Sequence, residues 1–305
     1  MKRRKFINIA GSSAIGLSTF PDVLFARGHA RILTAGELNG YLRSLVEVDE
    51  PSVDKIIAGD PDTVISKVGT AWMPYWQTLK EAREKGVNTM VVHEPTFYTH
   101  RDLEETKWDY LAAPSPAREL YMEQVAAKKH WIEENGMVII RCHDVLDKIG
   151  GFGIPYAFGR ALGFGDADLV RSKTYYNVYK IETRPAIEVA QHIASVLESV
   201  GQPGVAFYGD ENYPVKTVGL GTGCICNPME FMDLEMDLAI AIDDSISTWT
   251  QTTFAEDTGR PLIVVNHGTT EEFGMKELSV QLSKALRRFE TIHFNQGCSY
   301  QWVVA

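Results

Sequence analysis

Short apolar segments alternate with amphipathic segments along most of this 305-residue chain, and the alternation limits the possible folds more than any other feature. Runs of apolar residues predict buried strands at residues 89–92, 137–141, 238–242 and 262–265. Apolar residues at helical spacing predict helices, most clearly at residues 117–135 and 185–200. Strands that alternate with helices are typical of α/β proteins, so we expect an α/β fold. With 45% hydrophobic residues, the chain can bury a large core.

The first thirty residues differ in composition from the rest of the chain. They carry five basic residues, four of them at positions 2–5, against one acidic residue. A stretch of small and apolar residues follows at 6–20, and this layout is typical of an export signal. The segment Lys2-Arg3-Arg4-Lys5-Phe6-Ile7 resembles a twin-arginine signal, which predicts a protein that is exported in its folded state, to the periplasm or otherwise beyond the inner membrane. A disordered basic tail is the alternative, and residues 1–30 are excluded from the expected fold.

Charge, hydropathy and cysteine usage exclude several classes of protein. The net charge of −10 argues against a nucleic-acid-binding surface. No apolar run approaches the roughly 20 residues needed to cross a bilayer, so we expect no membrane association once the signal is removed. No CxxC pair occurs, which argues against a cysteine-based zinc site. The four cysteines are predicted to act as small buried residues; they are Cys142, Cys224, Cys226 and Cys298.

Three of the predicted strands end in a histidine that is accompanied by a carboxylate. The three pairs are His93 with Glu94, His143 with Asp147, and His267 with Glu271. The last two pairs are four residues apart, a spacing that puts both side chains on one side of a helical turn. Thr269 or Thr270 is a plausible N-cap for the helix expected after the third strand.

These pairs predict a metal site if the three strands are parallel neighbours. Open α/β sheets bind ligands beyond the carboxyl ends of their strands, so the six side chains would then meet in one crevice. Imidazole and carboxylate together suit Zn, Fe or Mn better than Mg or Ca. Six ligands exceed the need of one tetrahedral ion and suit two divalent ions. The alternative is that each histidine is an ordinary surface or hydrogen-bonded residue.

The same three segments resemble motifs of the NIF-three-like family of dinuclear metal-centre proteins, homologues of a type-two GTP cyclohydrolase. The family's His-His-Pro corresponds to His93-Glu94-Pro95. Its His-Thr-Asn-Leu-Asp segment corresponds to His143-Asp144-Val145-Leu146-Asp147, and its Gly-His-x-x-Thr-Glu segment to residues 266–271. The order agrees, and the resemblance spans roughly residue 35 to the C-terminus. One departure concerns the proposed ligands, because Glu94 replaces the second histidine of the first motif.

The resemblance implies two similar, intertwined α/β halves with the metals between them. Half one would comprise residues 31–167, completed by the C-terminal piece 260–305, and half two residues 168–259. It further implies a ring-shaped homohexamer with two divalent metal ions per chain. The ions would be held by His93, Glu94, Asp147, His267 and Glu271, with Glu271 the expected bridge. His143 corresponds to a family histidine near the metals.

Two classes of function are compatible with such a centre. The first is a metal-dependent hydrolase of a small molecule, in which the ions lower the pKa of a water to about 7. The second is a non-catalytic metal-binding protein or interaction scaffold that uses the ring as a platform. Metal-dependent turnover that is lost in His267→Ala without unfolding separates the two.

Overall fold

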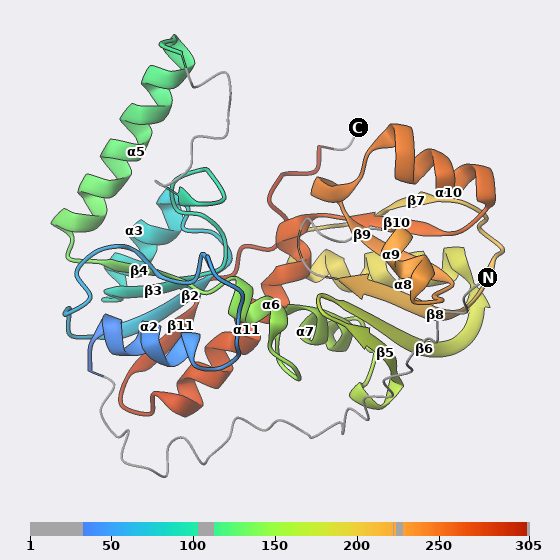
Figure 1. Ribbon diagram of the computed structural model, residues 1–305, viewed down its shortest axis with the longest axis horizontal. Helices are drawn as coiled ribbons and strands as arrows, with labels where there is room; N and C mark the ends of the chain where they lie inside the picture. The colour runs from blue at the N-terminus through green and yellow to red at the C-terminus, as the bar shows by residue number, and fades with distance from the viewer. Residues whose placement is uncertain (1–32, 103–112, 222, 224–227, 304–305) are drawn as a thin grey trace, which may run out of the picture.

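The computed structural model describes residues 33–102, 113–221, 223 and 228–303, which form two β-sheets covered by helices (Figure 1). This confirms the predicted α/β fold. The export signal at residues 1–30, and Cys224 and Cys226, lie outside the described residues. Within the described ranges, no helix is both long and apolar enough to span a membrane.

The first sheet contains five strands in the order β1-β4-β3-β2-β11, and all neighbours are parallel except β1 and β4. Its strands are β1 (Ile56–Ala58), β2 (Lys67–Ala71), β3 (Thr89–Val92), β4 (Val138–Arg141) and β11 (Glu290–His293). Alternate side chains of β3 enter opposite cores: Val91 packs with α2 and α11, and Val92 packs with α3 and α5. These helices are α2 (Ala35–Arg43), α3 (Trp76–Glu84), α5 (Pro116–Glu134) and α11 (His267–Ala285).

The second sheet contains six strands in the order β5-β6-β8-β9-β10-β7, with β8, β9 and β10 parallel. Its strands are β5 (Leu169–Lys173), β6 (Tyr176–Pro185), β7 (Ala206–Tyr208), β8 (Pro214–Gly221), β9 (Leu238–Ile242) and β10 (Leu262–Val265). One core on this sheet is formed with α7 and α8, and the other includes α9 and α10. The helices are α7 (Ile154–Ala161), α8 (Ala186–Leu197), α9 (Pro228–Asp233) and α10 (Thr253–Thr258).

Helix α11 connects the two sheets. It starts directly after β10 of the second sheet and then packs against β2 and β11 of the first sheet (Figure 1). It also contacts α7 closely at Gly274, where an added Cβ would lie 3.1 Å from the Cα of Ile154. The sequence-based division placed residues 260–305 with the first half. The structure places α11 and β11 there but puts β10 in the second sheet, because β10 forms hydrogen bonds with β9 and β7.

Lys128 on α5 is a buried charge that leads to a pH-dependent prediction. Its side chain is 4% exposed, and its Nζ donates to the Thr96 carbonyl at 3.0 Å. Burial lowers the pKa of Lys128 to about 8, although nearby Asp102 favours the charged form. Because the unfolded value is about 10.4, the charged side chain destabilises the folded state below pH 8. This penalty shrinks as the pH rises from about 8 to about 10.4.

Lys128→Met is therefore expected to raise the free energy of unfolding at pH 7 by about 1–2 kcal/mol, after the lost hydrogen bond is taken into account. The gain should fall toward zero at about pH 11, above both pKa values, where the wild-type lysine is mostly neutral in both states. Urea denaturation at both pH values measures this. Lys129→Met is the matched control, since Lys129 is the exposed neighbour on the same helix. Equal effects of the two substitutions would contradict the prediction.

Candidate metal centre

Two of the three predicted pairs lie at neighbouring strand ends of the first sheet. β3 and β4 are parallel neighbours, so the residues that follow them emerge at the same edge. His93 and Glu94 follow β3 directly. His143 lies two residues beyond β4 and precedes the short helix α6 (Asp144–Lys148), which carries Asp147. The sequence-based expectation of parallel neighbours is confirmed for these two strands.

The buried carboxylate of Asp54 fixes the start of α6. It accepts the backbone N–H groups of His143 and, at 3.0 Å, Val145. The Ser52 hydroxyl also donates to it at 3.0 Å. These bonds satisfy N–H groups that have no partner within a helix, and they hold His143 beside the end of β3.

The third pair comes from the second sheet, contrary to the expectation of three neighbouring strands in one sheet. His267 and Glu271 lie on the first turns of α11, which follows β10. Local sequence could not show which sheet β10 joins, because its apolar run suits either one. The pairs still converge, since α11 begins at the second sheet and runs back to the first.

Helix α11 also begins earlier than the sequence suggested. We expected Thr269 or Thr270 as the N-cap, whereas the helix starts at His267. The carboxylate of Asp243 accepts the N–H of His267 at 3.1 Å and thereby caps the helix from another loop. The Thr270 hydroxyl instead donates to the His267 carbonyl at 2.8 Å. The earlier start brings His267 to the edge of the centre.

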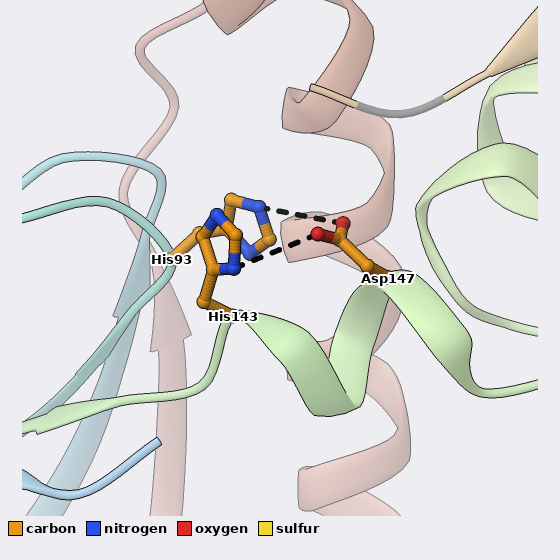
Figure 2. A group of neighbouring side chains, drawn as sticks. All are labelled: His93, His143 and Asp147. Carbon is orange, nitrogen blue, oxygen red and sulfur yellow. Dashed lines mark ion pairs between the residues drawn. The ribbon is translucent and has the colours of Figure 1, made fainter. Parts of the chain in front are cut away.

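The structure brings all six predicted side chains together. His93 Nε2 lies 3.2 Å from Glu271 Oε2 and 3.6 Å from Asp147 Oδ1. The His143 ring stacks on His93 with a centroid distance of 4.5 Å, and its Nδ1 lies 3.6 Å from Asp147 Oδ2 (Figure 2). His267 Nε2 lies 3.0 Å from Glu271 Oε1. That these six residues bind metal stays a prediction.

Each of the three imidazoles uses Nδ1 to donate a hydrogen bond. His93 donates to the Cys142 carbonyl at 3.2 Å. His143 donates to the Asp144 carboxylate at 2.9 Å, and His267 donates to the Asp244 carboxylate at 2.8 Å. A proton on Nδ1 leaves Nε2 of the neutral ring with a free lone pair. Metal-binding histidines are oriented by oxygen acceptors in this way. The arrangement therefore prepares three nitrogen ligands.

The carboxylates also control the charge of the imidazoles. Burial lowers the pKa of His93, but Glu271 and Asp147 outweigh burial and raise the pKa overall. Burial likewise lowers the pKa of His267, and Glu271 and Asp244 more than reverse the effect. The centre thus favours positive charge strongly, which is the electrostatic requirement for a cation site.

Several buried atoms of the centre lack the partner that a cation would provide. Among the described residues, His93 Nε2, His267 Nε2 and Glu271 Oε1 are buried and make no hydrogen bond. Buried polar atoms are rarely left in this state. Two groups have ligand atoms close enough to share an ion: His93 with His143 and Asp147, and His93 with Glu94 and Glu271. The nitrogen and oxygen donors present fit a divalent transition metal.

Three contacts of the centre were missed by sequence reasoning. They are Asp54 behind α6, Arg141 at the end of β4, and Trp72, whose Nε1 donates to Glu271 Oε2 at 2.7 Å. Arg141 carried a signal, since it is a charged residue in the otherwise apolar strand VIIR. Asp54 and Trp72 carried none, because their contacts join segments that are distant in sequence.

Asp244 provides a test of the imidazole orientation, because its carboxylate holds Nδ1 of His267. Asp244→Asn keeps the shape but weakens this bond and can favour the wrong ring orientation. We expect metal affinity to fall about 10–100-fold, as measured by Zn²⁺ titration calorimetry. Asp257→Asn, at an exposed position on α10, is the control and should leave the affinity unchanged. An unaltered affinity in Asp244→Asn would contradict this role.

A cavity of about 490 Å³ adjoins the centre at Asp147. Lys148 and Tyr156 line it from α6 and α7, and Ser172 and Thr174 line it from the β5–β6 hairpin. Its walls therefore include α6, α7 and the β5–β6 hairpin of the second sheet. Its hydroxyl and amino groups suit a small polar molecule rather than an apolar one.

A sequence profile of the Duf34/NIF3 (NGG1p interacting factor 3) family matches residues 53–297, and the chain belongs to this family. No curated protein matches the sequence. The fold is similar to that of the Staphylococcus aureus hypothetical protein SA1388, with a TM-score of 0.69, 17% identity, and coverage of 89% of this chain and 99% of that one. A Bacillus cereus protein related to NIF3 has a TM-score of 0.68, 12% identity, and coverage of 90% and 100%.

A structure of reduced HcgD from Methanocaldococcus jannaschii is also similar, with a TM-score of 0.61 and 18% identity. The matched region covers 86% of this chain and 97% of the HcgD chain. At these levels of identity, the neighbours show that the two-sheet α/β fold is shared.

Proposed function

We propose that this protein binds two divalent metal ions and uses them to hydrolyse a small polar substrate. The observation that carries the proposal is the cluster of six side chains with metal-ligand atoms, in which three buried atoms make no hydrogen bond. Structural ion-pair networks normally satisfy such atoms internally. A pair of cations would satisfy them here and would balance the three carboxylates.

Glu271 is the proposed bridge between the two ions. Its Oε2 faces His93 at 3.2 Å, and its Oε1 faces His267 at 3.0 Å, so its two oxygens point to different imidazoles. His93 and Asp147, with His143 beside them, would hold one ion. Glu94 and His267 would hold the other. Zn, Fe and Mn all suit this donor set.

When bound, two such ions lower the pKa of a water to about 7 and polarise the oxygen of the bond to be cleaved. The residues of the chain supply binding and orientation. Asp144 and Asp244 fix two of the imidazole rings, and the cavity beside Asp147 provides space for the substrate. Lys148 and the hydroxyl groups in its walls can orient a polar molecule near the centre.

The hydrolase proposal is tested by screening Mn²⁺- and Zn²⁺-loaded protein against phosphoester, amide and cyclic C–N substrates. Turnover that requires metal and disappears in His267→Ala, with the fold intact by circular dichroism, would support it. Tight metal binding without turnover on the whole panel would favour the alternative, a non-catalytic metal-binding scaffold.

We also propose that the protein is exported through the twin-arginine route and acts in the periplasm as a ring-shaped homohexamer. The basic segment at residues 2–5 supports the first part, and membership of the family supports the second. Replacing Arg3 and Arg4 by lysine should retain the protein in the cytoplasm, whereas the wild type should reach the periplasmic fraction. Light scattering of the purified protein tests the hexamer, and a monomer at micromolar concentration would contradict it.

A further inference from the structure

Arg141 is a buried cation at the end of β4, beside the proposed metal centre. It is 1% exposed and follows three apolar residues of the strand. Burying a guanidinium costs free energy unless its N–H groups and its charge are matched by partners. The partners of Arg141 therefore indicate what this residue is for.

Among the described residues, the hydrogen bonds and ion pairs of its guanidinium are with the segment that follows β3. Nε donates to the His93 carbonyl at 2.9 Å, and Nη1 donates to the His100 carbonyl. Nη2 donates to Glu94 Oε2 at 3.3 Å, and Nη1 lies 3.5 Å from Asp102 Oδ2. Arg141 thus contacts both ends of residues 93–102.

The segment folds around this cation in a backbone conformation that needs support. Tyr98 and Asp102 have φ values of 68° and 54°, in the left-handed region that is unfavourable for residues other than glycine. Asp102 Oδ1 accepts the N–H groups of Thr96 at 2.6 Å and Phe97 at 2.9 Å. Strained backbone beside a functional site persists only when its surroundings hold it.

The contact with Arg141 gives the two oxygens of Glu94 different surroundings. Oε2 faces the guanidinium, whereas Oε1 lies 3.4 Å from His267 Nε2 and 3.9 Å from His143 Nε2. In Glu271, by contrast, both oxygens face imidazoles. Glu94 therefore presents one oxygen to the centre.

We propose that Arg141 is a positioning residue that holds Glu94 as a one-oxygen ligand of the proposed metal centre. The inference rests on the proposed function, because it assigns a role toward the same ions. Beyond the proposed function, we infer that the affinity for metal depends on Arg141, and that this dependence acts through Glu94.

A double-mutant cycle on metal affinity tests this dependence. Mn²⁺ is titrated into the wild type, Arg141→Met, Glu94→Gln and the double variant, and free Mn²⁺ is followed by electron paramagnetic resonance. We expect Arg141→Met to weaken binding about 10–100-fold in the wild-type background. In the Glu94→Gln background, the same substitution should cause almost no further loss. A role in folding alone would not produce this non-additivity.

Circular dichroism and urea denaturation check that each variant is folded. If Arg141→Met does not fold, Arg141→Lys completes the cycle, because lysine keeps the charge but cannot hold Glu94 and the His93 carbonyl together. If the wild type binds Mn²⁺ but the losses of affinity caused by the two substitutions add, this inference is overturned and the proposed function is not. A folded wild type that binds no Mn²⁺ would overturn the proposed function, and this inference with it.

Discussion

Glu271→Gln is expected to lower the affinity for Zn²⁺ by more than about 100-fold, because even outer partners of metal ligands contribute about 10–100-fold. The substitution keeps the shape of the side chain but removes the charge that would lie between the two ions. The new amide also places an NH₂ group against His93 or His267, where an oxygen lies in the wild type. Titration calorimetry measures the affinity, and elemental analysis of the purified variant measures the number of ions per chain.

The matched control is Glu277→Gln on the same helix. Glu277 is half-buried and accepts a hydrogen bond from Gln281, one turn further along α11. It should leave metal affinity unchanged. If both variants bind metal as the wild type does, Glu271 is not a ligand and the assignment of the bridge is wrong.

Gly297→Ala is expected to lower the free energy of unfolding by about 3–5 kcal/mol, through strain and overlap together. Gly297 has a φ of +64°, and an added Cβ would overlap the Val200 carbonyl oxygen and lie 3.0 Å from its carbon. Here the chain returns from the first sheet to the second, and the next residue, Cys298, donates its N–H to Val200 at 2.9 Å. Because the obstacle is backbone, it cannot move aside as a flexible side chain would.

Gly136→Ala separates the two causes. Gly136 has a similar φ of +58°, but an added Cβ there would meet no atom within 4 Å. Gly136→Ala should lower the free energy of unfolding by about 1–2 kcal/mol, which is the strain of the left-handed conformation alone. Urea denaturation of both variants measures the difference. Equal losses would mean that the contact between Gly297 and Val200 contributes nothing.

The elements that the sequence predicted well are those whose pattern is local. β3 and β4 are continuous runs of buried residues, and α8 has a continuous apolar face. The three-residue strand β1 was missed, because so short a segment shows no period. β5 was missed as well, since most of its residues are partly or fully exposed.

The candidate site was predictable as a set of residues but not as a geometry. The histidine and carboxylate pairs were visible because each follows an apolar run or begins a helix. The route by which His267 reaches His93 was not visible, because it depends on α11 crossing from one sheet to the other. The roles of Arg141 and Asp54 likewise arise from contacts over long sequence separations.

Elemental analysis of the protein purified after export is the decisive test of the proposed metal centre. We expect about two divalent ions per folded chain, of the kind that imidazole and carboxylate ligands bind. A folded protein that carries no such ion, and takes up none when dialysed against Zn²⁺, Fe²⁺ or Mn²⁺, would contradict it.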